Sequence, residues 1–114
     1  MLARKNRILK KEDFAQIKRY GKSYFSGNIE LRVAKNSLGQ TRAGFIVGVQ
    51  FSKKAVERSR AKRWARETLR NYLAMLNQNQ DLLLIARKKD PKRTGKSQIK
   101  EDIGKVLFRG AAKE

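Results

Sequence analysis

Hydrophobic residues in the first half of the chain follow the spacing of strands. Residues 28–35 alternate, with Ile29, Leu31 and Val33 on one face of a predicted strand and polar or small residues on the other. Residues 42–51 are almost continuously apolar, which is typical of a strand that is buried on both faces. These two stretches predict the middle of a sheet.

Two shorter stretches complete the predicted sheet. Residues 22–26 are a candidate for a short strand, and residues 81–87 read as a short buried strand. The polar residues 36–40 predict a turn, and the basic residues 87–96, which include the single proline, predict a loop.

Helical spacing appears in three places. Residues 12–20 begin with two acids, place Phe14 and Ile17 on one face and precede a glycine, and residues 97–108 also carry one apolar face. The longest helix is predicted from Ser52, as its N-cap, to about Leu76. Its expected buried stripe consists of Trp64, Ala65, Thr68, Leu69, Tyr72, Met75 and Leu76.

The order of elements is therefore α-β-β-β-α-β-α. It predicts an α/β (α+β) two-layer sandwich, with a mixed four-stranded sheet and three helices. A length of 114 residues fits a single domain, 1–114, with a basic N-terminal arm at 1–11 and a basic loop at 87–96.

Charge narrows the class of partner. The chain has 29 Lys and Arg against 10 acids, a net charge of +19, and no His or Cys. This excess favours a nucleic-acid partner, and a membrane surface is the weaker alternative because the basic residues are spread over several elements. No apolar run is long enough to span a membrane and no signal peptide is evident, so we expect a cytoplasmic protein with no membrane partner.

The predicted long helix concentrates this charge. Residues 52–70 contain eight Lys or Arg and only two acids. On a helical wheel Lys62, Arg63, Arg66 and Arg70 fall outside the apolar stripe, which favours a phosphate-binding face over a simply solvated one. Arg58 lies nearer the apolar side, where contact with a cleft and exposure to solvent are equally compatible with its spacing.

Other residues carry weaker signals. Phe14, Tyr20, Tyr24, Phe25 and Phe45 could stack on bases, although core packing is the commoner role of an aromatic residue in a small domain. Arg32 lies opposite the buried face of its strand, where it either lines a cationic sheet face or is an ordinary exposed residue.

The sequence offers little for catalysis. The pairs Glu12–Asp13 and Glu101–Asp102 are neighbours on predicted helices and diverge by about 100°. Without His, Cys or convergent carboxylates, we predict no catalytic residue and no metal ion bound by the protein alone.

Four segments together resemble the bacterial ribonuclease P protein component. The resemblance covers about residues 7–108, and the basic helix is its most specific part. The segments are Leu9-Lys-Lys-Glu-Asp-Phe14, Arg42-Ala-Gly-Phe-Ile-Val, Ala55-Val-Glu-Arg-Ser-Arg-Ala-Lys-Arg-Trp-Ala-Arg-Glu and Asp81-Leu-Leu-Leu-Ile-Ala-Arg.

The resemblance implies a fold and a function. The family has a left-handed crossover around its long helix, which faces the ribonuclease P RNA through an Arg-Asn-Arg motif. A cleft between that helix and the sheet takes the 5′ leader of precursor tRNA. The RNA subunit and its Mg²⁺ ions cut the tRNA precursor, so the protein is the non-catalytic subunit of an endoribonuclease, with no obligate protein partner expected.

Site residues follow from the charge pattern together with this resemblance. The predicted RNA-binding residues are Lys53, Lys54, Arg58, Ser59, Arg60, Lys62, Arg63, Arg66 and Arg70. The predicted leader cleft consists of Phe14, Arg32, Arg58 and Ser59.

Two positions depart from the family pattern, and rival functions stay open. Ser59 stands where the family has Asn, and Val49 and Gln50 stand where many members have lysines, a charge that Lys53 and Lys54 would then supply. A small ribosomal protein is the main alternative function. A nuclease acting alone lacks a visible active site, and a helix-turn-helix protein lacks the short turn between two helices.

Overall fold

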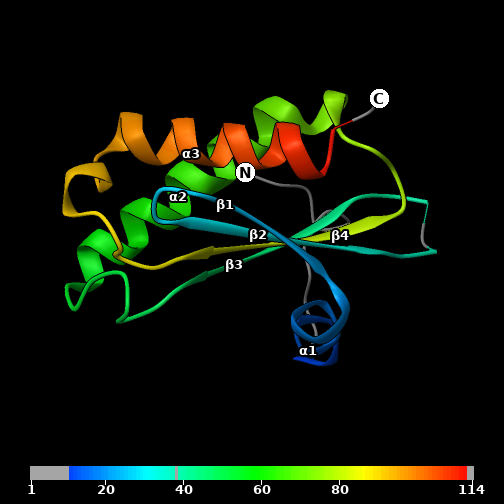
Figure 1. Ribbon diagram of the computed structural model, residues 1–114, viewed down its shortest axis with the longest axis horizontal. Coiled ribbons are helices and arrows are strands. Elements are labelled where there is room, and N and C mark those ends of the chain that lie inside the picture. Colours follow the sequence, from blue (N-terminus) through cyan, green and yellow to red (C-terminus); the bar gives the residue numbers. More distant parts are fainter. Residues whose placement is uncertain (1–10, 38, 113–114) are drawn as a thin grey trace.

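The computed structural model describes residues 11–37 and 39–112, so that most of the predicted N-terminal arm lies outside the described residues. The described chain forms three α-helices, four strands and two short 3₁₀ helices (Figure 1). Their bounds are α1 (Lys11–Tyr20), β1 (Lys22–Ser26), β2 (Ile29–Lys35), β3 (Arg42–Val47), α2 (Ala55–Tyr72), η2 (Leu73–Met75), β4 (Gln80–Ala86), η3 (Pro91–Arg93) and α3 (Lys96–Gly110).

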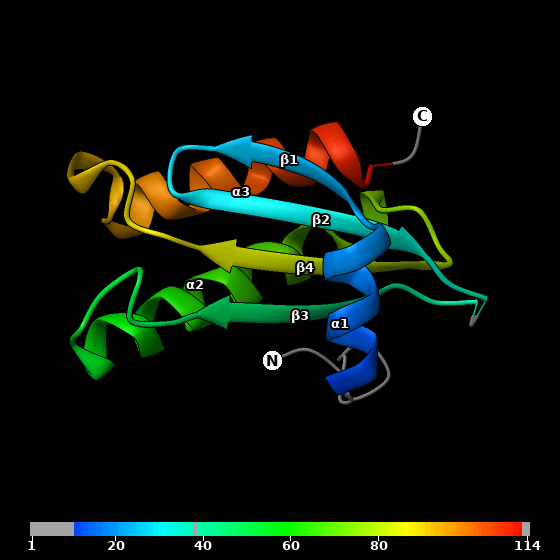
Figure 2. The ribbon, with the colours of Figure 1, turned by 60° about the horizontal axis from the view of Figure 1, so that its bottom comes forward.

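The predicted order of elements and the mixed sheet are confirmed. The four strands lie in the order β1-β2-β4-β3; β4 is antiparallel to β2 and parallel to β3. The connection from β3 through α2 to β4 is left-handed, as seen with α1 in front of the sheet and α2 behind it (Figure 2). Right-handed connections are the strong rule, so this crossover is a specific mark of the fold.

One face of the sheet packs against α2 and α3 and holds the main core. The alternation in β2 places Ile29 and Leu31 in this core, as predicted. α2 contributes Ala61, Ala65 and Leu69, whose small or branched side chains let the helix lie close to the strands. These contacts form the two layers that the sequence predicts.

The opposite face of the sheet is only partly covered. α1 crosses it at one end (Figure 2), where Ile17 and Phe14 pack with Leu83 and Ile85 of β4. Gly44 makes room for this contact, because a Cβ atom there would lie 2.5 Å from the Phe14 ring. The rest of this face has no helix over it, and it is therefore open to a ligand.

The predicted boundaries need correction around α2. The apolar run at 42–51 leaves the sheet at Val47, and the helix begins at Ala55, after Lys54 as its N-cap. Ser52 is not the N-cap. Its Oγ instead donates to Glu57 and accepts from the backbone N–H of Lys54, which orders the turn before the helix.

The end of the long helix also differs. α2 stops at Tyr72 and continues as the 3₁₀ helix η2, so Leu76 is buried in the following turn but Met75 is 46% exposed. The change of pitch rotates Met75 out of the stripe that a continuous α-helix would have formed.

Candidate nucleic-acid interface

The outward face of α2 and the turn before it carry the predicted RNA-binding residues. Arg58 and Lys62 are partly buried, and the other predicted residues are exposed. The exposed set consists of Lys53, Lys54, Ser59, Arg60, Arg63, Arg66 and Arg70. A row of cationic side chains over several helical turns matches the spacing of phosphates better than an isolated charge does.

These cations have almost no anionic neighbours of their own. Within residues 11–37 and 39–112, no ion pair involves any Lys or Arg between positions 53 and 70. Glu67, on the same helix, pairs with Lys100 of α3 instead. The charge of α2 is therefore left for a partner.

Two arginines of this helix contact the protein. Arg58 donates from Nη1 to the backbone carbonyl of Ser52 at 3.0 Å, which accounts for its partial burial. The Arg66 guanidinium lies 5.8 Å from the centre of the Phe45 ring, a cation–π distance. Neither contact neutralises the charge.

The open face of the sheet holds a hollow of about 350 Å³ beside α1. Lys18 and Arg87 line it together with Ile46, Gln50 and other residues of the turn after β3. This hollow combines positive charge with apolar strand surface, a combination suited to single-stranded nucleic acid.

An aromatic residue lies on the same sheet face. Phe25 pairs in register with Glu30 across β1 and β2, and its ring is 51% exposed. The Lys89 ammonium lies 5.0 Å from the centre of that ring. Together they provide a stacking surface and a cation next to each other.

The four residues of the predicted leader cleft do not lie together. Arg58 and Ser59 belong to α2, whereas Phe14 and Arg32 lie on the opposite face of the sheet, with α1. Arg32 donates to the backbone carbonyl of Lys18 on α1. The core fills the space between α2 and the sheet, so the expected cleft at that place is wrong, and the open hollow is on the α1 side.

Glu30 neutralises part of the positive charge on that side. Its carboxylate is 4% exposed as a residue and forms ion pairs with Arg32 and Arg87. Burial alone would raise the pKa of Glu30, but the hydrogen bonds from the two arginines outweigh it and lower the pKa below its ordinary value. The sheet face is therefore less cationic than its arginine count suggests.

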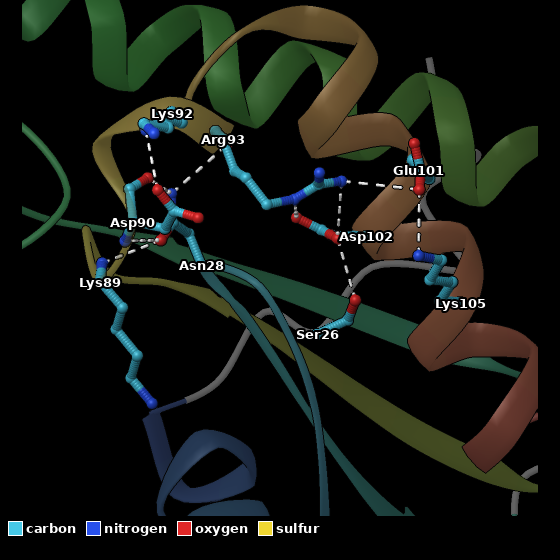
Figure 3. A network of polar contacts seen from close by, with 9 residues as sticks. All are labelled: Ser26, Asn28, Lys89, Asp90, Lys92, Arg93, Glu101, Asp102 and Lys105. Atoms are coloured by element: carbon cyan, nitrogen blue, oxygen red, sulfur yellow. Dashed lines mark hydrogen bonds and ion pairs between the residues drawn. The ribbon is translucent and has the colours of Figure 1, made fainter.

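A buried polar network holds the basic loop after β4. The Asn28 side chain accepts from the backbone N–H groups of Lys89 and Asp90 and donates to the carbonyls of Asp90 and Arg93 (Figure 3). Asp102 of α3, 1% exposed, binds Arg93 through both carboxylate oxygens and accepts from Ser26. The loop is thereby fixed to the β1–β2 turn and to α3.

Sequence reasoning missed the residues that line the sheet-face hollow. Lys18, Gln50, Arg87 and Lys89 come from three separate segments, and only the strand register brings them together. The alternation in β2, which placed Arg32 on this face, was the one signal that pointed there.

The described acidic side chains do not fit a magnesium site. No group of three or more acidic residues converges in the described ranges, and Glu30, Asp81 and Asp102 already bind arginines. In the same part of the chain, no helix is long and apolar enough to cross a membrane.

The fold and the charge of α2 define a small α+β protein with a helix that binds polyanions. The family model "Ribonuclease P" matches residues 2–110. The ribonuclease P protein component of Chloroflexus aggregans is 33% identical over 106 residues, covering 93% of this chain and 78% of that protein. The Thermotoga maritima protein component is 34% identical over 86 residues, covering 75% and 73%.

Solved structures agree with these matches. The Staphylococcus aureus RNase P protein superimposes with a TM-score of 0.81 at 27% identity, covering 91% of this chain and 94% of that one. The T. maritima RNase P protein gives 0.77 at 29% identity, covering 90% and 96%. The chain belongs to the family of bacterial ribonuclease P protein components. The predicted class, an RNA-binding subunit of the ribonuclease that processes tRNA, is confirmed, and nothing favours a ribosomal protein.

Proposed function

We propose that α2 is the surface through which this subunit binds the ribonuclease P RNA. The observation that carries this proposal is the row of exposed Lys and Arg side chains without ion pairs. Arginine guanidinium groups offer several donors in a fixed plane and match phosphate oxygens, and each phosphate they neutralise releases counterions. Such binding needs no base-specific contact and suits a large folded RNA.

The opposite sheet face is proposed to hold the 5′ leader of precursor tRNA. Support comes from the hollow beside α1, the exposed Phe25 ring and the neighbouring Lys89 and Arg87 side chains. Phe14 and Arg32 belong to this face and stay candidate leader contacts, whereas Arg58 and Ser59 are assigned to the RNA-binding face of α2. One protein would thus contact the RNA subunit and the substrate through two different surfaces.

The chemistry is proposed to belong to the RNA subunit. The residues that could bind a metal ion are already engaged with arginines, so Mg²⁺ would be held mainly by RNA. The protein would act by raising the affinity for substrate and by lowering the repulsion between the two RNA molecules. We expect the assembly to form in the cytoplasm, without an obligate second protein.

Reconstitution tests this function. The purified chain is added to a bacterial ribonuclease P RNA with precursor tRNA at a low Mg²⁺ concentration, at which the RNA alone cleaves poorly. We expect faster cleavage at the mature 5′ end, and a larger gain for a precursor with a leader of several nucleotides than for one with a minimal leader. No gain with either precursor would contradict the proposal, as would cleavage by the protein without RNA.

A further inference from the structure

A second hollow, of about 180 Å³, lies between the start of α2 and the loop after β4. Ser52, Glu57, Arg60 and Trp64 line one side, and Lys88 and Thr94 of the loop line the other. Drug-sized ligands occupy pockets of roughly 300–1,000 Å³, so this smaller space suits a single planar ring. It is separate from the hollow on the α1 side, whose lining shares no residue with it.

Trp64 gives this hollow a rigid aromatic wall. The side chain is partly buried and packs against the main core, while it also lines the hollow. An indole that is anchored on one side and open on the other can stack on a flat ligand with little loss of conformational freedom. Trp64 is also the only tryptophan of the chain.

Glu57 gives the hollow a hydrogen-bond acceptor. Ser52 Oγ donates to Glu57 Oε1 at 2.6 Å, which holds the carboxylate in place. The hydrogen bond from Ser52 and the charges of Lys54, Lys88 and Arg60 lower the pKa of Glu57, so it is ionised at neutral pH. A carboxylate at this place repels a phosphate from the hollow itself, while the surrounding cations attract one to its rim.

Fixed walls make this arrangement a site rather than a gap between mobile side chains. The backbone N–H of Lys88 donates to the carbonyl of Gln50 at 3.1 Å, which ties the loop to the turn before α2. The Asn28 and Asp102 contacts hold the rest of the loop (Figure 3). The loop wall is therefore in position before any ligand arrives.

We propose that this hollow binds one unpaired nucleobase that carries an exocyclic amino group. The base would stack on Trp64, its amino group would donate to Glu57, and Arg60 and Lys88 would contact the flanking phosphates. Guanine presents an imino and an amino donor side by side to a carboxylate and is expected to bind best, whereas uracil has no amino group. This inference rests on the proposed RNA-binding function of α2 and adds base selection to it.

Fluorescence of the single tryptophan reports on this site alone. The chain is titrated with the pentaribonucleotides UUGUU, UUAUU, UUCUU and UUUUU at constant salt, and affinity is measured in parallel by anisotropy of end-labelled copies. We expect UUGUU to quench Trp64 and to bind about tenfold more tightly than UUUUU, the effect of one hydrogen bond to a charged group. Quenching by all four to the same extent would overturn base selection.

Matched variants separate the contributions. Glu57→Gln should bring the affinities for UUGUU and UUUUU to within about twofold, while Glu67→Gln, the same change outside the hollow, should leave the preference intact. Trp64→Leu should weaken UUGUU binding roughly tenfold, and Phe108→Leu, which removes an exposed ring of α3, should not. Trp64→Phe keeps a ring and serves if Trp64→Leu unfolds.

The two proposals fail differently. Binding of all four oligonucleotides by anisotropy, without any change of tryptophan fluorescence, would overturn the base site and leave the RNA-binding role of α2 standing. Absence of binding to any oligonucleotide and to the ribonuclease P RNA would contradict the proposed function itself.

Discussion

Two sets of cationic side chains on this protein differ in what they contact. Those of α2 are exposed and form no ion pair within the described residues, whereas Arg32, Arg42, Arg87 and Arg93 each bind one or two acids. The acids in the second set are largely buried, and the arginines that cover them therefore hold strands and loops together. The difference teaches that the same residue type serves a partner in one region and the fold in the other.

The largest expected effect comes from neutralising the unpaired set. Arg63→Gln, Arg66→Gln and Arg70→Gln in one chain should weaken binding to the ribonuclease P RNA roughly tenfold to 100-fold at physiological salt. The slope of log affinity against log salt should fall by up to about 2.7, near 0.9 for each lost phosphate contact. The melting temperature should hardly change, because these side chains support no other part of the protein.

A control with the same loss of charge elsewhere makes this test specific. Lys100→Gln, Lys105→Gln and Arg109→Gln remove three cations from α3, and we expect a much smaller change of slope. If both triple variants lower the slope equally, net charge alone drives binding and the contrast between the two sets is wrong.

The next effect concerns the paired set and appears as lost stability. Asp102→Ala removes a buried carboxylate that binds Arg93 and Ser26. We expect the free energy of unfolding to fall by about 1–3 kcal/mol, less than for a fully buried pair because the Arg93 side chain is 30% exposed. Urea unfolding measures this loss, and Asp102→Asn, which can still accept from Ser26, should lose less. Equal stability of all three chains would contradict a structural role.

The sequence predicted the first set better than the second. A helical wheel separates the cations of α2 from Ala61, Ala65 and Leu69, because both the apolar stripe and the charge follow one local period. The pairing of Glu30 with Arg32 and Arg87 depends on the register of β2 against β4, to which no local pattern points. For the same reason, neither hollow was foreseen.

The fold shows the same division between local and long-range information. Alternation and apolar runs predicted the four strands, and caps and glycines predicted where most helices begin and end. The side of the sheet on which α1 lies depends on the fit of Phe14 over Gly44, a contact between segments about thirty residues apart. That placement moved Phe14 and Arg32 away from Arg58 and Ser59.

A smaller effect is expected when paired arginines are released. Glu30→Gln removes the acid that neutralises Arg32 and Arg87, whose side chains are 26% and 38% exposed and can turn towards a ligand. We expect the affinity for a single-stranded leader oligonucleotide to rise by a few-fold, with a salt slope steeper by up to about 0.7. Anisotropy at several salt concentrations measures both. An unchanged slope would mean that neither arginine faces the leader.

The smallest effect, a dependence of stability on pH, separates ion pairing from mere proximity at Glu30. Because the pKa of Glu30 is lower in the folded than in the unfolded chain, its ionisation stabilises the fold above its ordinary pKa of 4.5. That contribution is lost as the pH falls through the folded-state value. The free energy of unfolding should therefore drop more steeply below about pH 4.5 in the natural chain than in Glu30→Gln. Parallel pH profiles of the two would indicate that Arg32 and Arg87 are as free as the cations of α2, and the contrast between the two regions would then fail on the sheet face.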